Sequence, residues 1–171
     1  MAFPVHVITP KKDRNWTRIY VCSLVMKIHK IVNSEVLPDW IKRPSLVSFL
    51  HENLKPYEDT VEDIERGLDY AFSTQPGKGG FVLLAEQDRR LIGVLVMLHT
   101  GMEGYIPPNL LLFVAVDKHY RGKGIGRKLC AHAIAECEGE VCLHVEYDNP
   151  AKRLYERLGF NTKYAEMRLK R

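Results

Sequence analysis

The segment RGKGIGRK, residues 121–128, places three glycines and four basic side chains directly after an apolar run. Glycine adopts positive φ easily and lets an anion come close to the main chain. If a strand ends before this segment and a helix begins within it, several unpaired backbone N–H groups converge where the helix dipole also favours negative charge. The segment therefore predicts a phosphate-binding loop, with Arg121, Lys123 and Arg127 adding positive charge around it.

Two common phosphate-binding motifs do not fit this segment. A Walker loop needs GxxxxGK followed by Ser or Thr, and the chain contains no such sequence. A dinucleotide-binding fingerprint needs GxGxxG, whereas residues 122–127 read GKGIGR. A basic turn that contacts nucleic-acid backbone, or no ligand at all, is a third interpretation. The motif alone leaves this third interpretation open.

Length, charge and cysteine content limit the function classes. A chain of 171 residues fits one domain and buries roughly 68–70% of its unfolded surface. Its 25 basic and 21 acidic residues give a net charge of +4, too small an excess for a dedicated nucleic-acid binder. Cys22, Cys130, Cys137 and Cys142 have no CxxC or metal-ligand spacing, so we expect reduced thiols, no metal and a cytoplasmic protein. No apolar stretch reaches the roughly 18 residues of a membrane span, so we expect no membrane partner.

The elements around the glycine-rich segment follow from apolar periodicity and turn signals. Residues 109–116, NLLLFVAV, predict a central strand covered on both faces. A stripe of apolar residues from Ile125 to Cys137 predicts the helix that follows. The other expected elements of this half are a hairpin of strands at 81–87 and 90–100, a strand at 140–147, a short helix at 150–158 and a final strand at 160–170.

The first 75 residues are expected to be mainly helical. A short strand at residues 4–10 precedes an amphipathic helix that ends near Asn33. Ser45 is expected to cap one further helix, and Asp59 or Thr60 another. Helices thus lead and strands with crossovers follow, which predicts an α/β or α+β domain around a mixed sheet flanked by helices.

Two motifs in the second half resemble the GNAT superfamily of N-acetyltransferases. Arg121-x-x-Gly124-x-Gly126 after a buried strand looks like that superfamily's acyl-CoA pyrophosphate motif. Residues 144–160, HVEYDNPAKRLYERLGF, look like its strand, asparagine, helix, Leu-Tyr and Leu-Gly-Phe block. The resemblance implies a single acetyltransferase domain over residues 1–171, with acceptor-side helices in residues 1–75 and the acyl-CoA-binding and catalytic part in residues 80–170.

The resemblance also implies where acetyl-CoA binds. The central strand would part from the next parallel strand, at residues 141–147, and admit the pantetheine arm between them. Backbone groups near Phe113, Val114 and Val116 would bind the arm, and the N–H of Phe113 or Val114 would polarise the thioester carbonyl. The pyrophosphate would lie on the backbone amides of Arg121, Gly122, Lys123, Gly124, Ile125, Gly126 and Arg127.

The same resemblance suggests the groups that move protons. Tyr155 falls on the Leu-Tyr position that acts as general acid in many relatives, although a tyrosine beside leucines on an amphipathic helix otherwise packs in a core. His144 aligns with the glutamate base of the related ribosomal-protein N-terminal acetyltransferases, and an imidazole exchanges protons near neutral pH. A structural histidine is the alternative for His144. Glu146 and Glu103 come second as bases, because solvated charges explain them equally well, and some relatives use ordered water.

Two further features of this block bear on the chemistry. Asn149 precedes Tyr155 by six residues where relatives have seven, so it is either a cofactor contact or the N-cap of a helix that starts one residue later. Strand alternation places Cys142 on the same face as His144 and Glu146. A covalent route would need a thiolate beside a base, and the pair Cys142 and His144 is the only hint of one.

We therefore expect an N-acetyltransferase that moves the acetyl group of acetyl-CoA to a primary amine by direct nucleophilic attack. The acceptor is a small-molecule or peptide amine. Deprotonation at pH 7 costs roughly 4.6 kcal/mol for a lysine-like amine and about 1 kcal/mol for an α-amine, which leans towards α-amines. The alternatives are a nucleic-acid-binding module and an acyl-CoA sensor of the same fold without turnover.

Overall fold

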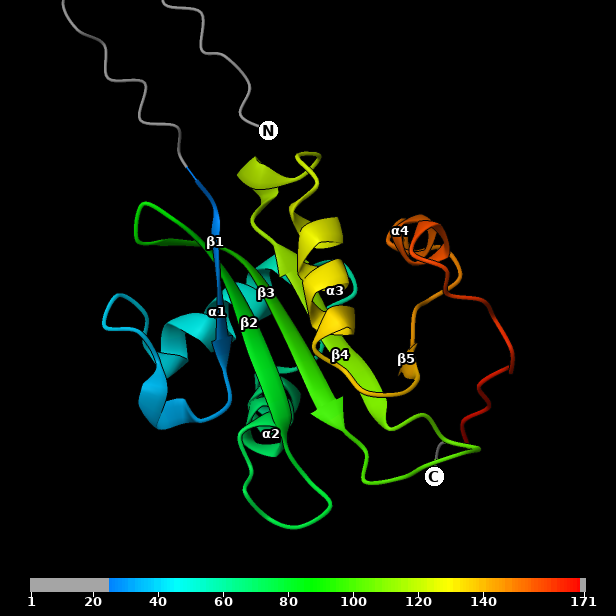
Figure 1. Ribbon diagram of the computed structural model, residues 1–171. Helices are drawn as coiled ribbons and strands as arrows, with labels where there is room; N and C mark the ends of the chain where they lie inside the picture. Colours follow the sequence, from blue (N-terminus) through cyan, green and yellow to red (C-terminus); the bar gives the residue numbers. More distant parts are fainter. Residues whose placement is uncertain (1–24, 170–171) are drawn as a thin grey trace, which may run out of the picture.

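A computed structural model describes residues 25–169 of the chain (Figure 1). One mixed sheet of five strands runs through these residues, with antiparallel pairing from β1 to β4 and parallel pairing of β4 with β5. The strands are β1 (Lys27–Ile31), β2 (Gly80–Gln87), β3 (Arg90–His99), β4 (Asn109–Val116) and β5 (Val141–Leu143). The predicted α/β domain with a mixed sheet is confirmed.

Helices cover both faces of the sheet (Figure 1). They are α1 (Arg43–Leu54), α2 (Val61–Ala71), α3 (Ile125–Ala135) and α4 (Lys152–Arg157), with short 3-10 helices at Ser34–Val36 (η1) and Lys118–Tyr120 (η2). Helices α1 and α2 pack against one face of β2, which presents Val82 and Leu84, and α3 packs against the other, which presents Phe81 and Leu83. This burial on both faces explains why β2 and β3 consist almost wholly of apolar residues.

Strand β4 carries a bulge at Leu112. Met97 of β3 pairs with Leu111 and the neighbouring Val96 pairs with Phe113, so Leu112 has no partner in the register with β3. A bulge shifts the alternation of side chains and bends the strand. Leu111 accordingly packs on the α3 side of the sheet, whereas Leu112 and Phe113 both pack on the α1–α2 side.

The prediction of a helix that ends near Asn33 is wrong for the residues that the structure describes, because Lys27–Ile31 form strand β1. The spacing of Ile28 and Ile31 suits a helix, but their segment is hydrogen-bonded along its length to β2. Pairing with a neighbouring strand thus overrides a short periodic pattern. The strand expected at residues 4–10 and the earlier part of the helix lie outside the described residues.

The end of the chain is less regular than the sequence predicts. Strand β5 is shorter than the expected strand at 140–147, and residues 160–169 form no strand. Every residue from 161 to 169 is exposed, so this segment has no buried face to hold it against a sheet. His144 and Glu146 therefore lie after the end of β5. No strand places their side chains on one face, contrary to the sequence prediction.

The N-terminus of α1 also differs from the prediction. The helix begins at Arg43, with Lys42 at the N-cap position and Pro44 in the first turn, so Ser45 caps nothing. Thr60 caps α2 as predicted, because its Oγ1 accepts a hydrogen bond from the Asp63 N–H at 3.1 Å. The hairpin, β4, α3 and α4 occur where the sequence predicts them, to within a few residues at their ends.

We expect Thr60→Ala to lower the free energy of unfolding by about 1 kcal/mol, because the Asp63 amide loses its cap. The midpoint of thermal unfolding should fall by roughly 2–4 °C in a domain of this size. Ser45→Ala is the matched control: it replaces an exposed residue inside α1 by a better helix former, so its midpoint should stay or rise. Equal losses in the two variants would contradict the assignment of Thr60 as the cap.

Candidate functional site

The glycine loop, residues 121–127, joins the end of β4 to the start of α3 as the sequence predicts. Gly122 and Gly124 have φ of 75° and 78°, and the space that a Cβ would occupy at either position is open. Gly124 is the N-cap residue of α3 and makes no side-chain cap bond. The amides of the first helical turn, from Ile125 onward, therefore keep their capacity to bind an anion, and the helix dipole adds to it.

Gly126 lies where β4, α3 and α4 meet. A Cβ at this position would stand 3.5 Å from Leu154 Cδ2 of α4 and 3.7 Å from Val116 Cγ2 of β4. Helix α4 therefore packs beside the glycine loop. Tyr155, the next residue along α4, lies in the same core cluster as Ile125.

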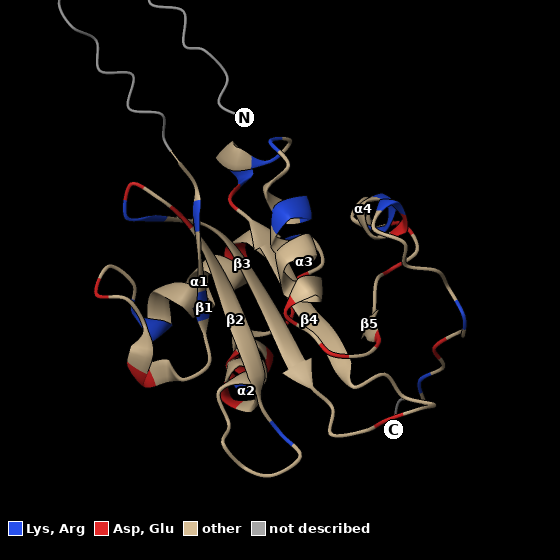
Figure 2. Cartoon of the chain, in the orientation of Figure 1, with Lys and Arg blue, Asp and Glu red and all other residues tan. Residues whose placement is uncertain are grey.

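Arg121 holds the glycine loop in place. Its Nε donates to the Val116 carbonyl at 3.1 Å, and its Nη2 donates to the Asn53 carbonyl, near the end of α1, at 2.7 Å. The Lys118 N–H donates to Asn53 Oδ1 at 3.3 Å. The guanidinium thus serves backbone carbonyls, a role that the sequence did not predict. Lys and Arg positions gather around this loop and the start of α3 (Figure 2). Besides Arg121, the exposed basic residues in the segment 121–128 are Lys123, Arg127 and Lys128.

Pairing between β4 and β5 ends early. Their parallel register contains three pairs and stops with Leu111 opposite Leu143, whereas β4 continues to Val116. The last pair lies directly before the bulge at Leu112. The residues predicted to bind the cofactor through their main chain lie beyond this point; they are Phe113, Val114 and Val116.

Tyr155 of α4 is buried, with 7% of its surface exposed. Its ring packs edge-on against Phe160, with the ring centroids 6.0 Å apart, in the cluster that also contains Cys130. Burial, with a smaller contribution from Cys130, raises the pKa of the Tyr155 hydroxyl above its ordinary value of 10.0. The phenol therefore keeps its proton at neutral and moderately alkaline pH, the state that a proton donor needs.

His144 follows β5 and is exposed. The pKa of the Glu166 carboxyl is lowered, first by its hydrogen bond from Arg168 and to a smaller extent by His144. His144 therefore lies beside the C-terminal segment, residues 160–169. Its ring is accessible to a substrate from solvent.

Tyr57, which no sequence pattern singles out, links the α1–α2 loop to the segment between β5 and α4. Its hydroxyl donates to the Asp148 carbonyl at 3.3 Å, across a separation of 91 residues. Partial desolvation and the nearby carboxylates of Asp148 and Glu146 raise the pKa of Tyr57. Glu146, which is exposed, thus belongs to the neighbourhood of Tyr57.

Asn149 organises the turn before α4. Its Oδ1 accepts a hydrogen bond from the Ala151 N–H at 2.9 Å, and its carbonyl accepts one from the Lys152 N–H at 3.0 Å. Helix α4 begins at Lys152 and its N-cap residue is Ala151, two residues after Asn149. The prediction that Asn149 caps this helix is therefore wrong, because its side chain closes the turn that precedes the helix.

The cysteines near the site are held as thiols. Burial raises the pKa of Cys130 to about 12 and also raises that of Cys142. A thiolate at Cys142 is therefore unfavourable at neutral pH, which argues against a covalent route through this residue. Within residues 25–169 no cluster of metal-ligating side chains forms, and no helix is long and apolar enough to cross a membrane.

Two comparisons by sequence match parts of this chain to a known family and a known protein. A family model described as an acetyltransferase (GNAT) domain matches residues 78–162, which contain both the glycine loop and Tyr155. N-alpha-acetyltransferase 30 of Schizosaccharomyces pombe is 28% identical in an alignment of 127 residues that covers 68% of this chain and 83% of that protein.

Solved structures share the fold. A possible acetyltransferase from Clostridium difficile 630 has a TM-score of 0.60 at 19% identity, covering 85% of this chain and 97% of that one. The aminoglycoside N-acetyltransferase AAC(6')-Iy in complex with CoA has a TM-score of 0.59 at 15% identity, covering 86% and 95%. The family match, the fold and the glycine loop agree, and the chain belongs to the GNAT family of acetyl-CoA-dependent acetyltransferases.

Proposed function

We propose that the protein transfers the acetyl group of acetyl-CoA directly to the N-terminal α-amine of a polypeptide. The observation that carries this proposal is that β4 stops pairing with β5 at Leu111. The rest of β4 then leads to the start of α3, where no side chain caps the helix. From Leu112 to Val116, the edge of β4 that faces β5 therefore has no strand partner, and it runs towards the amides of the glycine loop. An extended ligand that ends in an anion fits this arrangement.

Acetyl-CoA has a part for each of these features. Its pantetheine arm carries amides that can bind the main chain between Phe113 and Val116 as an added strand does. Its pyrophosphate matches the open amides at the start of α3, with Lys123 and Arg127 nearby. A side chain at Gly124 would project into the space that the pyrophosphate needs.

The chemistry needs an unprotonated amine, a stabilised oxyanion and a proton for the departing thiolate. The amine nitrogen attacks the thioester carbonyl and gives its proton to His144, while a backbone N–H at Phe113 or Val114 binds the oxyanion. When the C–S bond breaks, the sulfur takes a proton from Tyr155. Tyr155 regains a proton from solvent and His144 releases one, so each turnover moves one proton from nitrogen to sulfur.

The base is the less constrained part of this mechanism. His144 and Glu146 are both exposed, and an imidazole accepts a proton at neutral pH far more readily than a carboxylate does. Glu146 also has Tyr57 and Asp148 as neighbours, on the side of the α1–α2 loop. We therefore assign the base to His144 and keep Glu146 as the second candidate.

Exposed aromatic side chains support a polypeptide acceptor. Tyr105, Tyr147 and Tyr164 are 78%, 80% and 58% exposed, and the rings of Tyr105 and Tyr164 lie 5.6 Å apart. A polypeptide covers such surface, whereas a small metabolite leaves most of it in water. Similarity to an N-alpha-acetyltransferase favours the α-amine, as does the cost of about 1 kcal/mol for deprotonating it at pH 7.

The acceptor class is tested with three amines: a peptide with a free N-terminus and one internal lysine, the same peptide with a blocked N-terminus, and a small aminosugar. We expect release of the CoA thiol with the free peptide alone, and an acetyl group on its α-amine in fragment mass spectra. Acetylation of the lysine or the aminosugar instead would overturn the acceptor class. Acetyl-CoA binding without thiol release from any amine would identify an acyl-CoA sensor.

The raised pKa of Tyr155 predicts the pH profile of kcat. The rate should show no falling limb up to about pH 10, because the Tyr155 hydroxyl stays protonated there. Tyr155→Phe should lower kcat by roughly 10²–10⁴-fold at every pH. Its Kd for acetyl-CoA should stay within about twofold, since the hydroxyl acts only as the thiolate leaves.

His144→Ala should lower kcat by roughly 10²–10⁴-fold, because the attacking amine loses its base. Glu146→Gln removes a carboxylate two residues further along and should retain the activity. If Glu146→Gln were the variant that loses activity, Glu146 would be the base. Unchanged turnover in Tyr155→Phe would remove Tyr155 from the mechanism.

Variants of Arg121 and Arg127 should distinguish a residue that holds the loop in place from one that binds the cofactor through its charge. Arg121→Ala removes the donors to two backbone carbonyls and should lower the free energy of unfolding by about 1–2 kcal/mol without any ligand. Arg127→Ala should keep that stability within about 0.5 kcal/mol but weaken acetyl-CoA binding several-fold. Thermal unfolding with and without acetyl-CoA measures both effects. If Arg121→Ala kept full stability but lost acetyl-CoA binding, the Arg121 guanidinium would be a ligand of the phosphate and not a support of the loop.

A further inference from the structure

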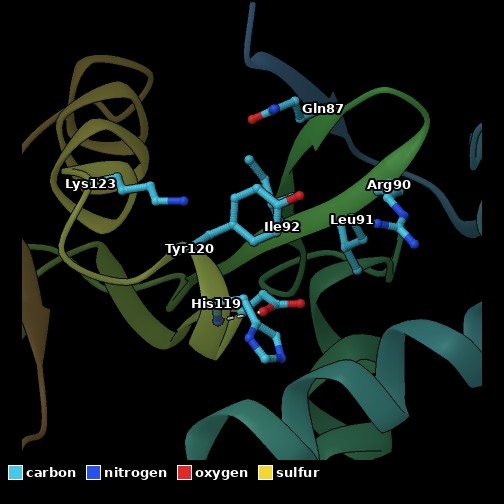
Figure 3. Close-up of a pocket in the computed structure, with 8 residues that line it drawn as sticks. Gln87, Arg90, Leu91, Ile92, His119, Tyr120 and Lys123 are labelled. Carbon is cyan, nitrogen blue, oxygen red and sulfur yellow. Dashed lines mark hydrogen bonds between the residues drawn. The ribbon is translucent and has the colours of Figure 1, made fainter. Parts of the chain in front are cut away.

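A cavity of about 730 Å³ lies between the β2–β3 turn and the segment that leads from β4 into the glycine loop (Figure 3). Arg90 and Ile92 of β3 line one side, and His119, Tyr120 and Lys123 line the other. Its lining, among the described residues, includes none from β5 or α4, so the cavity is separate from the β4–β5 side proposed for acetyl-CoA. Its volume is within the range of roughly 300–1,000 Å³ that small-molecule sites occupy.

Basic side chains dominate the charge of this cavity. Arg90, His119 and Lys123 contribute to its lining, and Asp117 is its single carboxylate. Asp117 Oδ1 already accepts a hydrogen bond from the His119 N–H at 2.8 Å, as the cap of η2. Within residues 25–169, Arg90, His119 and Lys123 form no ion pair. Apart from Asp117, the described residues that line the cavity place no negative charge beside Arg90 and Lys123.

Tyr120 gives the cavity a second kind of contact. Lys123 Nζ lies 4.8 Å from the centroid of the Tyr120 ring, which restrains the ammonium group beside the cavity. Leu91 and Ile92 add apolar surface to the lining. The cavity thus combines cationic groups with the Tyr120 ring and aliphatic side chains. This combination suits an organic anion that carries more than one charge.

We propose that this cavity binds a small polyanion, carrying phosphate or carboxylate groups, while acetyl-CoA occupies the other side of the glycine loop. The planar guanidinium of Arg90 binds one anionic group in a forked geometry, and Lys123 binds another as a point charge. These two residues come from the start of β3 and the glycine loop, so the ligand connects the two segments.

The site is coupled to the cofactor through Lys123. A polyanion on Lys123 neutralises positive charge beside the pyrophosphate position and adds repulsion there, so it weakens acetyl-CoA binding. Acetyl-CoA weakens polyanion binding by the same factor, because coupling between two ligands is reciprocal. This coupling rests on the proposed cofactor site, whereas the polyanion site itself does not.

The test titrates the full chain, saturated with CoA so that the glycine loop is occupied, with tripolyphosphate in one arm and citrate in the other. Isothermal titration calorimetry at constant ionic strength should detect one saturable site. The tighter probe identifies phosphate or carboxylate as the preferred group. Arg90→Ala should weaken binding by about tenfold or more, because it removes a charged hydrogen-bonding partner.

Arg89→Ala is the matched control. It removes the same charge one residue away, but Arg89 Nη2 bonds Asp39 Oδ2 at 2.8 Å and does not line the cavity. Its affinity for the probe should stay within about twofold of the unsubstituted protein. Equal weakening in the two variants would reduce the site to general surface charge and overturn the proposal.

Two further measurements separate this proposal from the proposed function. Without a probe, Arg90→Ala should bind acetyl-CoA as the unsubstituted protein does, and added probe should weaken acetyl-CoA binding several-fold only when Arg90 is present. Absence of probe binding to the CoA complex would show competition at the pyrophosphate position and would overturn a separate site. If CoA itself does not bind, the proposed function fails, and the contrast between Arg90→Ala and Arg89→Ala in the unliganded protein still tests the cavity.

Discussion

The hydrogen bonding of β4 on its two edges decides where a ligand can enter this molecule. On one edge β4 pairs with β3 from Asn109 to Val116, interrupted only at the Leu112 bulge, and on the other it pairs with β5 only as far as Leu111. Backbone groups of a half-buried strand require partners, so the unpaired edge favours an extended ligand. Because β4 leads into the glycine loop, a ligand on this edge is also directed to the amides of α3.

The core packs around Tyr155, the proposed proton donor. Tyr155 packs in a cluster with Cys130 and Phe160, and α4 lies beside the start of α3 at Gly126. The burial that fixes the ring also raises the pKa of its hydroxyl. Packing and proton donation are therefore not competing explanations of Tyr155, because the same desolvation keeps the phenol protonated where a thiolate would depart.

The sequence predicts those parts of the fold that carry a local signal. The hairpin and β4 are continuous apolar runs because both faces of the sheet are covered, and Thr60 caps a helix through a residue three positions away. The length of β5, the bulge at Leu112 and the strand at Lys27–Ile31 depend on which segments pair in space. No local pattern contains that information, so these features were missed or misread.

Arg121 illustrates the same limit within the site. Its place in the motif suggested a ligand for phosphate, but its guanidinium donates to the carbonyls of Val116 and Asn53. Anion binding then depends on fixed backbone amides, and the arginine contributes by holding the loop that carries them. Because Asn53 ends α1 and Tyr57 of the following loop bonds the Asp148 carbonyl, one short segment touches both sides of the proposed cofactor site. Under the proposed function, α1 and the loop after it therefore support the cofactor site, although their sequence carries none of its motifs.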